Sequence, residues 1–137
     1  MDGLVIILFV TVLIIGVSLL LIIALTRKSP PGINKNEFRT KWLAIENSLD
    51  GTEPSRHLAI LNADKLLDTA LKARGFKGET MGERMKSAKK SFRNNNVVWA
   101  AHKLRNQIAH EEVNVKPQTT KQALSAFKGA LKDLGAL

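Results

Sequence analysis

The chain begins with an apolar run that contains no charged residue, from Leu4 to Leu25. As an α-helix, with a rise of about 1.5 Å per residue, this run is roughly 33 Å long. The hydrocarbon core of a bilayer is about 30 Å thick, so a helix of this length can cross it. The pattern therefore predicts a single membrane-spanning helix near the N-terminus.

A cleaved signal peptide is the alternative interpretation of such a run. Signal peptides carry basic residues before a shorter apolar core and small residues at a cleavage site after it. Here no Lys or Arg precedes the run, and no clear small-x-small site follows it. We therefore expect an uncleaved anchor.

After the anchor, apolar residues recur every three or four positions, which is the spacing of one face of an α-helix. Asn34 with Glu37 and Thr80 with Glu83 resemble capping boxes, and Pro117 suits the first turn of a last helix. The expected apolar faces are Phe38, Trp42, Ile45 and Leu49; Ile60, Ala63, Leu67, Ala70 and Leu71; Met81, Met85, Ala88 and Phe92; Val97, Val98, Ala101, Leu104 and Ile108; and Ala123, Phe127, Leu131 and Leu134. No strand pattern competes, so the predicted fold class is all-α, with the membrane helix followed by a bundle of four to five helices.

The punctuation of the chain predicts three parts. Residues 1–28 form the transmembrane anchor with its basic flank, residues 29–35 form a Pro/Gly linker, and residues 36–137 form the helical bundle domain. The linker begins with Ser29-Pro30-Pro31-Gly32, which stops the membrane helix. About 100 residues remain, enough to bury one modest core.

Charge predicts the orientation of the anchor. Only Asp2 precedes the apolar run, whereas Arg27 and Lys28 follow it directly, and the 21 basic and 11 acidic residues after the run give a net charge of +10. Because positive residues are retained on the cytoplasmic side, we expect a single-pass protein of the inner (cytoplasmic) membrane with its N-terminus outside and its bundle in the cytoplasm. Arg27 and Lys28 are expected to meet anionic lipid. The absence of cysteine excludes disulfides and thiolate zinc sites.

A second basic cluster lies far from the anchor, on the third predicted helix of the bundle. This helix is expected to run from Thr80 through Phe92 until Asn94-Asn95-Asn96 breaks it, and its side chains Lys86, Lys89, Lys90 and Arg93 would then fall within an arc of about 100°. Such a stripe suits the phosphates of a nucleic acid, bound without sequence preference and weakened by salt. A solvated helix face is the competing interpretation, and no aromatic residue is interleaved to stack on bases.

Arg105 falls inside the apolar arc of the fourth predicted helix, and a buried guanidinium needs a partner. Asp64 or Asp68 on the second helix can supply it, as can a phosphate if the fourth helix faces a cleft or a second subunit. His110, at the end of the same helix, can bond the last free carbonyls. His102 is either a second proton carrier or, as we expect, an exposed helix residue.

Arg105, the polar Asn106, and His110 after four intervening residues resemble the Arg-polar-x-x-x-His motif of HEPN-like domains. These are small four- or five-helix bundles of prokaryotic ribonuclease toxins and defence proteins. The resemblance covers residues 36–134 in helix order, and its specific part is the six-residue motif.

The resemblance implies a metal-independent endoribonuclease that works as a homodimer, with two copies of the motif facing each other. Arg105, Asn106 and His110 would be catalytic: His110 moves protons at the ribose or the leaving oxygen, Arg105 stabilises phosphate charge, and Asn106 orients His110 or a phosphate oxygen. No cofactor is expected, because the three histidines at 57, 102 and 110 do not form a metal site.

Two other functions compete with cleavage. In the first, the chain is a non-catalytic, membrane-tethered helical adaptor in which Arg105 forms a structural ion pair and the basic face meets lipid or an acidic partner. In the second, the chain is a nucleotide-binding module, although Gly75, Gly78 and Gly82 are spaced as turn and cap glycines and not as a phosphate loop.

Overall fold

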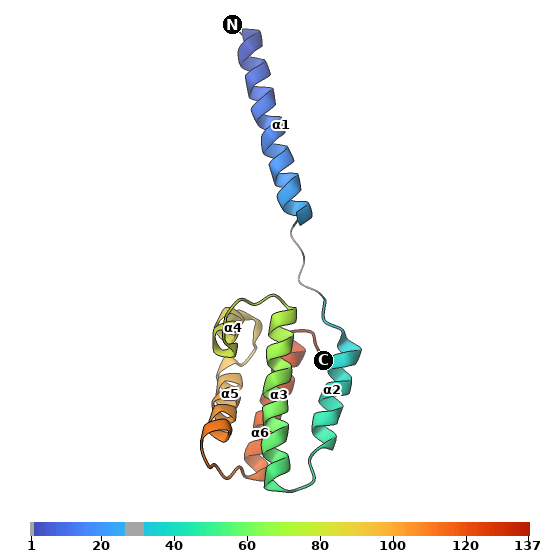
Figure 1. The fold of residues 1–137 in the computed structure, drawn as a ribbon, viewed down its shortest axis with the longest axis vertical. Coiled ribbons are helices and arrows are strands. Elements are labelled where there is room, and N and C mark those ends of the chain that lie inside the picture. The colour runs from blue at the N-terminus through green and yellow to red at the C-terminus, as the bar shows by residue number, and fades with distance from the viewer. Residues whose placement is uncertain (1, 27–31) are drawn as a thin grey trace. The chain divides into compact units, whose positions relative to one another are not determined.

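The computed structural model describes residues 2–26 and 32–137, and within them it contains six α-helices and one short 3₁₀ helix (Figure 1). The elements in chain order are α1 (Asp2–Thr26), α2 (Lys35–Asn47), α3 (Glu53–Ala73), α4 (Met81–Ser87), η1 (Lys89–Ser91), α5 (Asn95–His110) and α6 (Pro117–Asp133). The all-α prediction is confirmed. The predictions for Arg27, Lys28 and the start of the linker lie outside the described residues.

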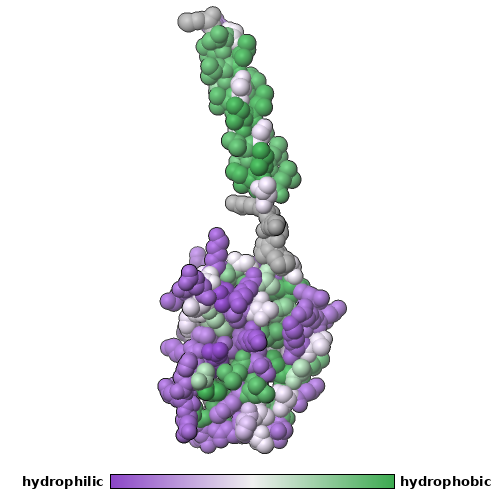
Figure 2. All heavy atoms as spheres, in the orientation of Figure 1, coloured by the Kyte–Doolittle hydropathy of each residue, from purple (hydrophilic) through white to green (hydrophobic). Residues whose placement is uncertain are grey.

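The chain divides into two compact units, Met1–Pro30 and Pro31–Leu137, and the first consists of α1. None of the residues of α1 is buried, and hydrophobic side chains cover the face that Figure 2 shows. The hydroxyl groups of Thr11 and Ser18 donate to the carbonyl oxygens four residues earlier, so these polar side chains are satisfied within the helix. By length and composition α1 can be a membrane span or a signal sequence.

The second unit is a helical bundle with α3 at its centre. Helix α3 packs against α2, α4, α5 and α6, and α6 also packs against α5. Helices α3 and α6 run in one direction, and α2 and α5 run in the other (Figure 1). The largest fully buried side chains are Ile60, Leu67, Leu71, Met85, Val115, Phe127 and Leu131. The bundle therefore has a core of its own.

The predicted helix starts are confirmed where side-chain caps mark them. Asn34 accepts a hydrogen bond from the amide of Glu37, and Thr80 and Glu83 form a reciprocal capping box. Just after the C-terminal end of α3, Gly75 adopts a φ of 78°, a conformation that glycine adopts without steric cost. These local signals place four of the five bundle helices close to their predicted bounds.

The prediction of one helix from Thr80 to Phe92 is wrong. Helix α4 ends at Ser87, and a 3₁₀ turn, η1, follows, in which the amide of Ser91 donates to the carbonyl of Ala88. The amide of Arg93 then donates to the Asp133 carboxylate of α6 at 2.9 Å. A tertiary contact therefore replaces the helical hydrogen bond and turns the chain into α5.

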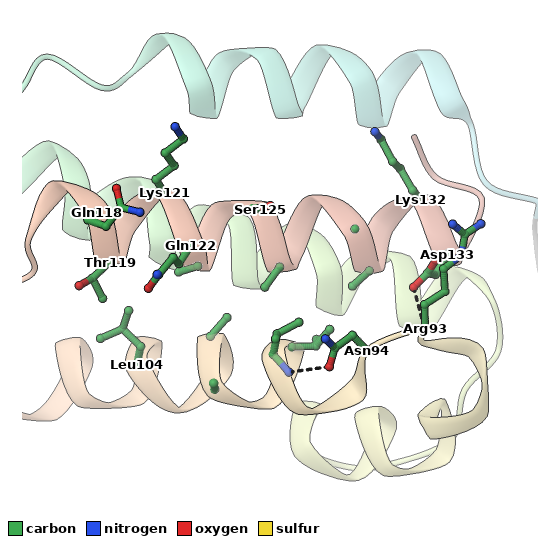
Figure 3. A pocket seen from close by; sticks show the side chains of 18 residues that line it. Arg93, Asn94, Leu104, Gln118, Thr119, Lys121, Gln122, Ser125, Lys132 and Asp133 are labelled. Carbon is green, nitrogen blue, oxygen red and sulfur yellow. Dashed lines mark hydrogen bonds and ion pairs between the residues drawn. The ribbon is translucent and has the colours of Figure 1, made fainter.

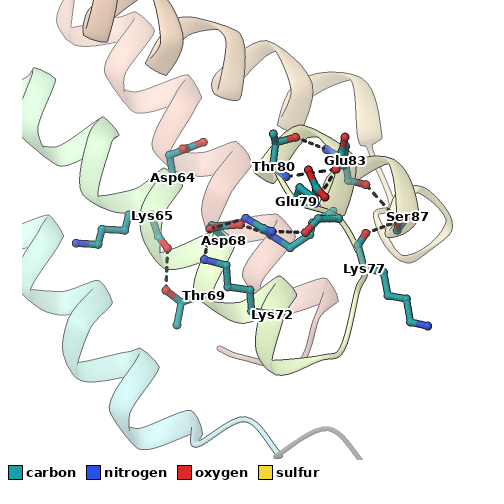
Figure 4. A network of polar contacts seen from close by, with 12 residues as sticks. Asp64, Lys65, Asp68, Thr69, Lys72, Lys77, Glu79, Thr80, Glu83 and Ser87 are labelled. Atoms are coloured by element: carbon teal, nitrogen blue, oxygen red, sulfur yellow. Dashed lines mark hydrogen bonds and ion pairs between the residues drawn. The ribbon is translucent and has the colours of Figure 1, made fainter.

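A polar network fixes α4 and the loop before it against α3 (Figure 4). Arg84 is only 8% exposed and binds both carboxylate oxygens of Asp68, at 2.7 and 3.1 Å, while its Nη1 donates to the carbonyl of Gly78. Ser87 Oγ donates to the carbonyl of Lys77 at 2.8 Å. A Cβ on Gly78 would lie 2.6 Å from the amide of Arg84, so only glycine permits this close approach.

The bundle has two ends that differ in the connections they carry. At one, which we call the α4 end, lie the start of α2, the end of α3, α4, η1, the start of α5 and the end of α6 (Figure 1). The opposite end carries the α2–α3 and α5–α6 connections. Arginine side chains join α3 to the α6 region at both ends: Arg56 Nε donates to the carbonyl of Val115, and Arg74 Nε donates to that of Leu134.

The turn between α2 and α3 predicts an acid-sensitive contribution to stability. The hydroxyl of Thr52, its amide and the hydroxyl of Ser55 lower the pKa of Asp50 from 3.8 to about 2. Because the pKa is lower in the folded state, this carboxylate stabilises the fold above about pH 4, and the contribution is lost as the pH falls to about 2. In thermal unfolding monitored by circular dichroism, Asp50→Asn should lower the melting temperature at pH 6 and much less at pH 2. An equal difference at both pH values would contradict this assignment.

Candidate functional site

Four polar side chains of α3 and α5, one of them a buried carboxylate, form a closed ring of contacts. Asp64 of α3 is 3% exposed, and its Oδ1 lies 2.8 Å from His102 Nδ1 of α5. His102 Nε2 lies 3.4 Å from Asn106 Nδ2, and Asn106 Oδ1 accepts a hydrogen bond from Arg105 Nη1 at 3.0 Å. Arg105 Nε lies 3.3 Å from Asp64 Oδ2 and closes the ring.

Helical spacing explains why α5 supplies three members of this ring. Residues three and four positions apart lie on one face of a helix, so His102, Arg105 and Asn106 are neighbours. That face meets α3, which packs directly against α5. Asp64 lies on the buried side of α3, where a carboxylate without partners would be strongly destabilising. The two helices therefore need each other's polar groups.

The ring also defines hydrogen-bond directions. The carbonyl oxygen of Asn106 accepts a hydrogen bond from Arg105, so its amide nitrogen faces Nε2 of His102. The contact of 2.8 Å between His102 Nδ1 and Asp64 Oδ1 has the length of a hydrogen bond from the ring to the carboxylate. The carboxylate thus holds the imidazole, and the imidazole holds the amide that positions the guanidinium.

Arg105 is held on its inner side and open on its outer side. The pair with Asp64 is a contact between charges and not a directed hydrogen bond, because the buried Nε has no hydrogen-bond partner within the described residues. The directed bond is the one from Nη1 to Asn106. The side chain retains 36% of its exposure, so its outer edge is available to an anion. Of the two carboxylates predicted as partners, Asp64 contacts Arg105, whereas Asp68 binds Arg84 and Lys72.

The carboxylate of Asp68 belongs to the α4 network. Burial raises the pKa of Asp68, but hydrogen bonds from Arg84 and then from Lys72 outweigh burial, and the pKa is lowered overall. Asp68 is therefore a charged structural group that anchors α4, and it lies four residues after Asp64 on α3.

His110 is exposed at the end of α5, and the described residues make no ion pair or hydrogen bond with its ring. At about 100° per residue, His110 lies roughly 140° around the helix from Arg105. A single copy of the bundle therefore does not direct both side chains toward one point. Asn106 is committed to Arg105 and His102 rather than to His110.

His102 was missed as a member of the site, and the expectation that it is exposed is wrong. Its residue is 8% exposed, and its ring packs edge-on against Trp99 with the centroids 5.9 Å apart. The available signal was its spacing of three and four residues from Arg105 and Asn106, on the side of α5 that Arg105 marks as inward.

The predicted basic stripe is not a single helix face, because α4 ends at Ser87. Lys86, Lys89 and Lys90 are nevertheless all exposed. Arg93 lies apart from them, with Nε 3.2 Å from the Asp133 carboxylate of α6.

Comparison with models of protein families, with curated proteins and with solved structures finds no match to this chain. The resemblance of residues 105–110 to the HEPN motif therefore stays a prediction from six residues. Within residues 2–26 and 32–137, no group of three or more His, Asp or Glu side chains is arranged to hold a metal ion.

A groove of about 840 Å³ runs between α5 and α6, and none of the four ring residues lines it (Figure 3). Its floor is apolar or small, and its rim carries polar side chains such as Gln118 and Lys121. The floor comprises Val97, Val98, Ala101, Leu104, Ala123, Ala126, Gly129 and Ala130. Val97 is 43% exposed, which is unusual for a valine that faces a core helix. This groove is a surface on which another helix can pack.

Proposed function

We propose that this chain is a membrane-anchored HEPN-like domain that cleaves single-stranded RNA without a metal ion. The observation that carries the proposal is the state of Arg105: Asp64 and Asn106 hold its inner side while its outer edge remains open to an anion. A positioned guanidinium that is only partly occupied is suited to a phosphate whose charge grows in the transition state. Five residues further along, the same helix carries an exposed imidazole.

In this proposal each side chain has a separate task. His110 accepts the proton of the ribose 2′-hydroxyl, and the 2′-oxygen attacks the adjacent phosphorus. The bond from phosphorus to the 5′-oxygen breaks, the leaving oxygen takes a proton from water, and His110 releases the proton that it accepted to solvent. The products end in a 2′,3′-cyclic phosphate and a 5′-hydroxyl. Arg105 stabilises the phosphate, and Asn106, Asp64 and His102 position Arg105.

The cleft is composite, because Arg105 and His110 of one copy point to different sides of α5. A second copy would bring its His110 toward the Arg105 of the first. The apolar groove between α5 and α6 supports such an assembly, since it offers a surface for a helix on the same two helices, although its lining stops at Leu104 and includes no residue of the motif. The anchor α1 supports it too, because chains confined to one bilayer meet at a raised effective concentration.

The anchor is part of the proposal. We take α1 as an uncleaved, single-pass span of the cytoplasmic membrane with the N-terminus outside, because its only charged neighbour on that side is Asp2. The bundle then lies in the cytoplasm, where RNA is present.

The test is an RNA cleavage assay with the full-length chain in detergent micelles, at low salt and with EDTA. We expect cleavage of single-stranded RNA and cyclic-phosphate ends on the products. RNA of the same sequence with 2′-O-methyl groups should stay intact, because it lacks the attacking hydroxyl. Intact RNA in both samples would contradict the nuclease proposal.

A non-catalytic membrane-tethered adaptor is the second candidate, and a specific observation favours it. The contact between Arg105 and Asp64 gives the arginine a structural role that needs no phosphate. In that case the groove between α5 and α6 receives a helix of another protein, and RNA remains uncut.

A further inference from the structure

The two ends of the bundle differ in charge. Residues 72–93, at the α4 end, contain eight basic and two acidic residues. At the opposite end, residues 46–56 contain three acidic residues and one basic residue, Arg56, and residues 111–116 contain two acidic residues and one basic. The bundle is therefore polarised along its length, positive where α2 begins and negative where α5 ends.

Ion pairs consume only part of the positive charge at the α4 end. Arg84 and Lys72 bind Asp68, and Arg93 binds Asp133. Lys77, Lys86, Lys89 and Lys90 are exposed, and none of them is within ion-pair distance of a carboxylate of the described residues. The Glu83 carboxylate is turned onto the amides of Glu79 and Thr80. Four ammonium groups thus remain available to an outside partner.

The segment that carries these lysines is held in place. The bonds from Arg84 to Asp68 and Gly78, and from Ser87 to Lys77, fix the loop and α4 to α3, while the Lys77 side chain extends away from this network (Figure 4). The tertiary contact of Arg93 with Asp133 ends η1. The backbone that carries these lysine side chains is therefore held in place by tertiary contacts.

We propose that the α4 end is a binding surface for an anionic lipid bilayer, with Lys77, Lys86, Lys89 and Lys90 contacting the headgroups. Only five residues, 27–31, separate the end of α1 from the described start of the bundle at Gly32. A bilayer that holds α1 therefore keeps the bundle at a high effective concentration near lipid headgroups. The acidic opposite end is repelled by the same surface, so the charge polarity selects one orientation.

Lipid suits these lysines better than RNA does. The aromatic residues in and beside this segment are Phe92, which is 6% exposed, and Phe76 and Trp99, which are half-buried against the core, so no ring stands fully exposed for a base to stack on. None of these four lysines lines the groove between α5 and α6, which could otherwise hold a nucleic-acid strand. A flat bilayer surface with negative headgroups needs no groove. Each lysine near such a surface contributes about a fivefold increase in affinity at low salt.

The absence of cysteine allows a site-specific test in the full-length chain. Ser91→Cys at the α4 end and Glu112→Cys at the opposite end, both exposed positions, each carry one fluorophore. The labelled chains are reconstituted in bilayers of phosphatidylcholine, with or without about 30% phosphatidylglycerol, that contain a headgroup quencher. We expect quenching at position 91 only with phosphatidylglycerol, and none at position 112 in either bilayer.

Charge reversal completes the test. Lys86→Glu, Lys89→Glu and Lys90→Glu together should lower the equilibrium constant for binding to the bilayer surface by about 10²-fold, which is measured as a loss of quenching at position 91. High salt should also reduce this quenching. Reversal of Lys103, Lys116 and Lys121, which are exposed elsewhere, is the matched control and should leave quenching intact. Equal signals in both bilayers would overturn the proposal. A signal that responds to single-stranded RNA but not to phosphatidylglycerol would overturn it in favour of RNA. Either outcome leaves the cleavage test of Arg105 and His110 unaffected.

Discussion

Replacement of His110 by alanine should slow metal-free RNA cleavage by about 10²–10⁴-fold, the usual contribution of one general acid or base. The fold should be unchanged, because His110 is exposed at the last residue of α5 and contacts no other described side chain by hydrogen bond or ion pair. The rate is measured on single-stranded RNA in EDTA, and helicity by circular dichroism. Gln107→Ala, at an exposed position one turn earlier on α5, is the matched control and should retain the rate.

A mixing experiment separates a composite cleft from a site within one copy. If each cleft combines Arg105 of one chain with His110 of the other, a mixture of Arg105→Ala and His110→Ala chains contains dimers with one intact cleft. Such a mixture should recover up to about a quarter of the activity, although each variant alone is inactive. No recovery, in a sample that co-purifies as a mixed dimer, would contradict the shared cleft. Full activity of His110→Ala alone would remove the histidine from the mechanism.

Replacement of Asp64 by alanine should reduce the free energy of unfolding by about 3–5 kcal/mol, the range observed when one partner of a buried ion pair is removed. Asp64 is 3% exposed and is the carboxylate that both His102 and Arg105 contact. Its removal leaves the Arg105 charge half-buried without compensation. Urea unfolding of the full-length chain in micelles, followed by the fluorescence of Trp42 and Trp99, measures the loss.

Two further variants define the cause of that loss. Glu112→Ala removes an exposed carboxylate and should change stability by less than about 0.5 kcal/mol. Asp64→Leu combined with Arg105→Met replaces the charged pair by apolar groups and should recover much of the stability, because the uncompensated charge is gone. A loss below about 1 kcal/mol in Asp64→Ala would mean that the ring contributes little. If the double variant is as unstable as the single one, the Arg105 charge is not the cause, and the loss comes from packing or from the buried His102 ring that has lost its partner.

The structural role of Asp64 and the chemical role of His110 can be told apart in the same proteins. Asp64→Ala should lower both stability and cleavage, because Arg105 loses its anchor. His110→Ala should lower cleavage alone. The adaptor function predicts the first effect on stability and no cleavage in any variant.

Local signals in the sequence predicted most of the secondary structure, because helix starts and apolar periodicity depend on neighbours in the chain. The cap at Asn34, the capping box at Thr80 and the apolar length of α1 each involve residues within a few positions of each other. The inward placement of Arg105 on α5 followed from the same periodicity, and so did its need for a carboxylate.

Long-range contacts decided the rest. The sequence alone left Asp64 and Asp68 as equal candidates, and only the packing of α3 on α5 brings Asp64 to His102, 38 residues away. The helix expected to reach Phe92 stops at Ser87, and after the 3₁₀ turn the amide of Arg93 binds Asp133, 40 residues away, a partner that local sequence could not name. The lysines are close together in the sequence, but their place at the end of the bundle where α2 begins depends on how the helices are arranged. Periodicity states which face of a helix is buried, but the identity of the partner on that face is a property of the folded chain, and the candidate site is made of such partners.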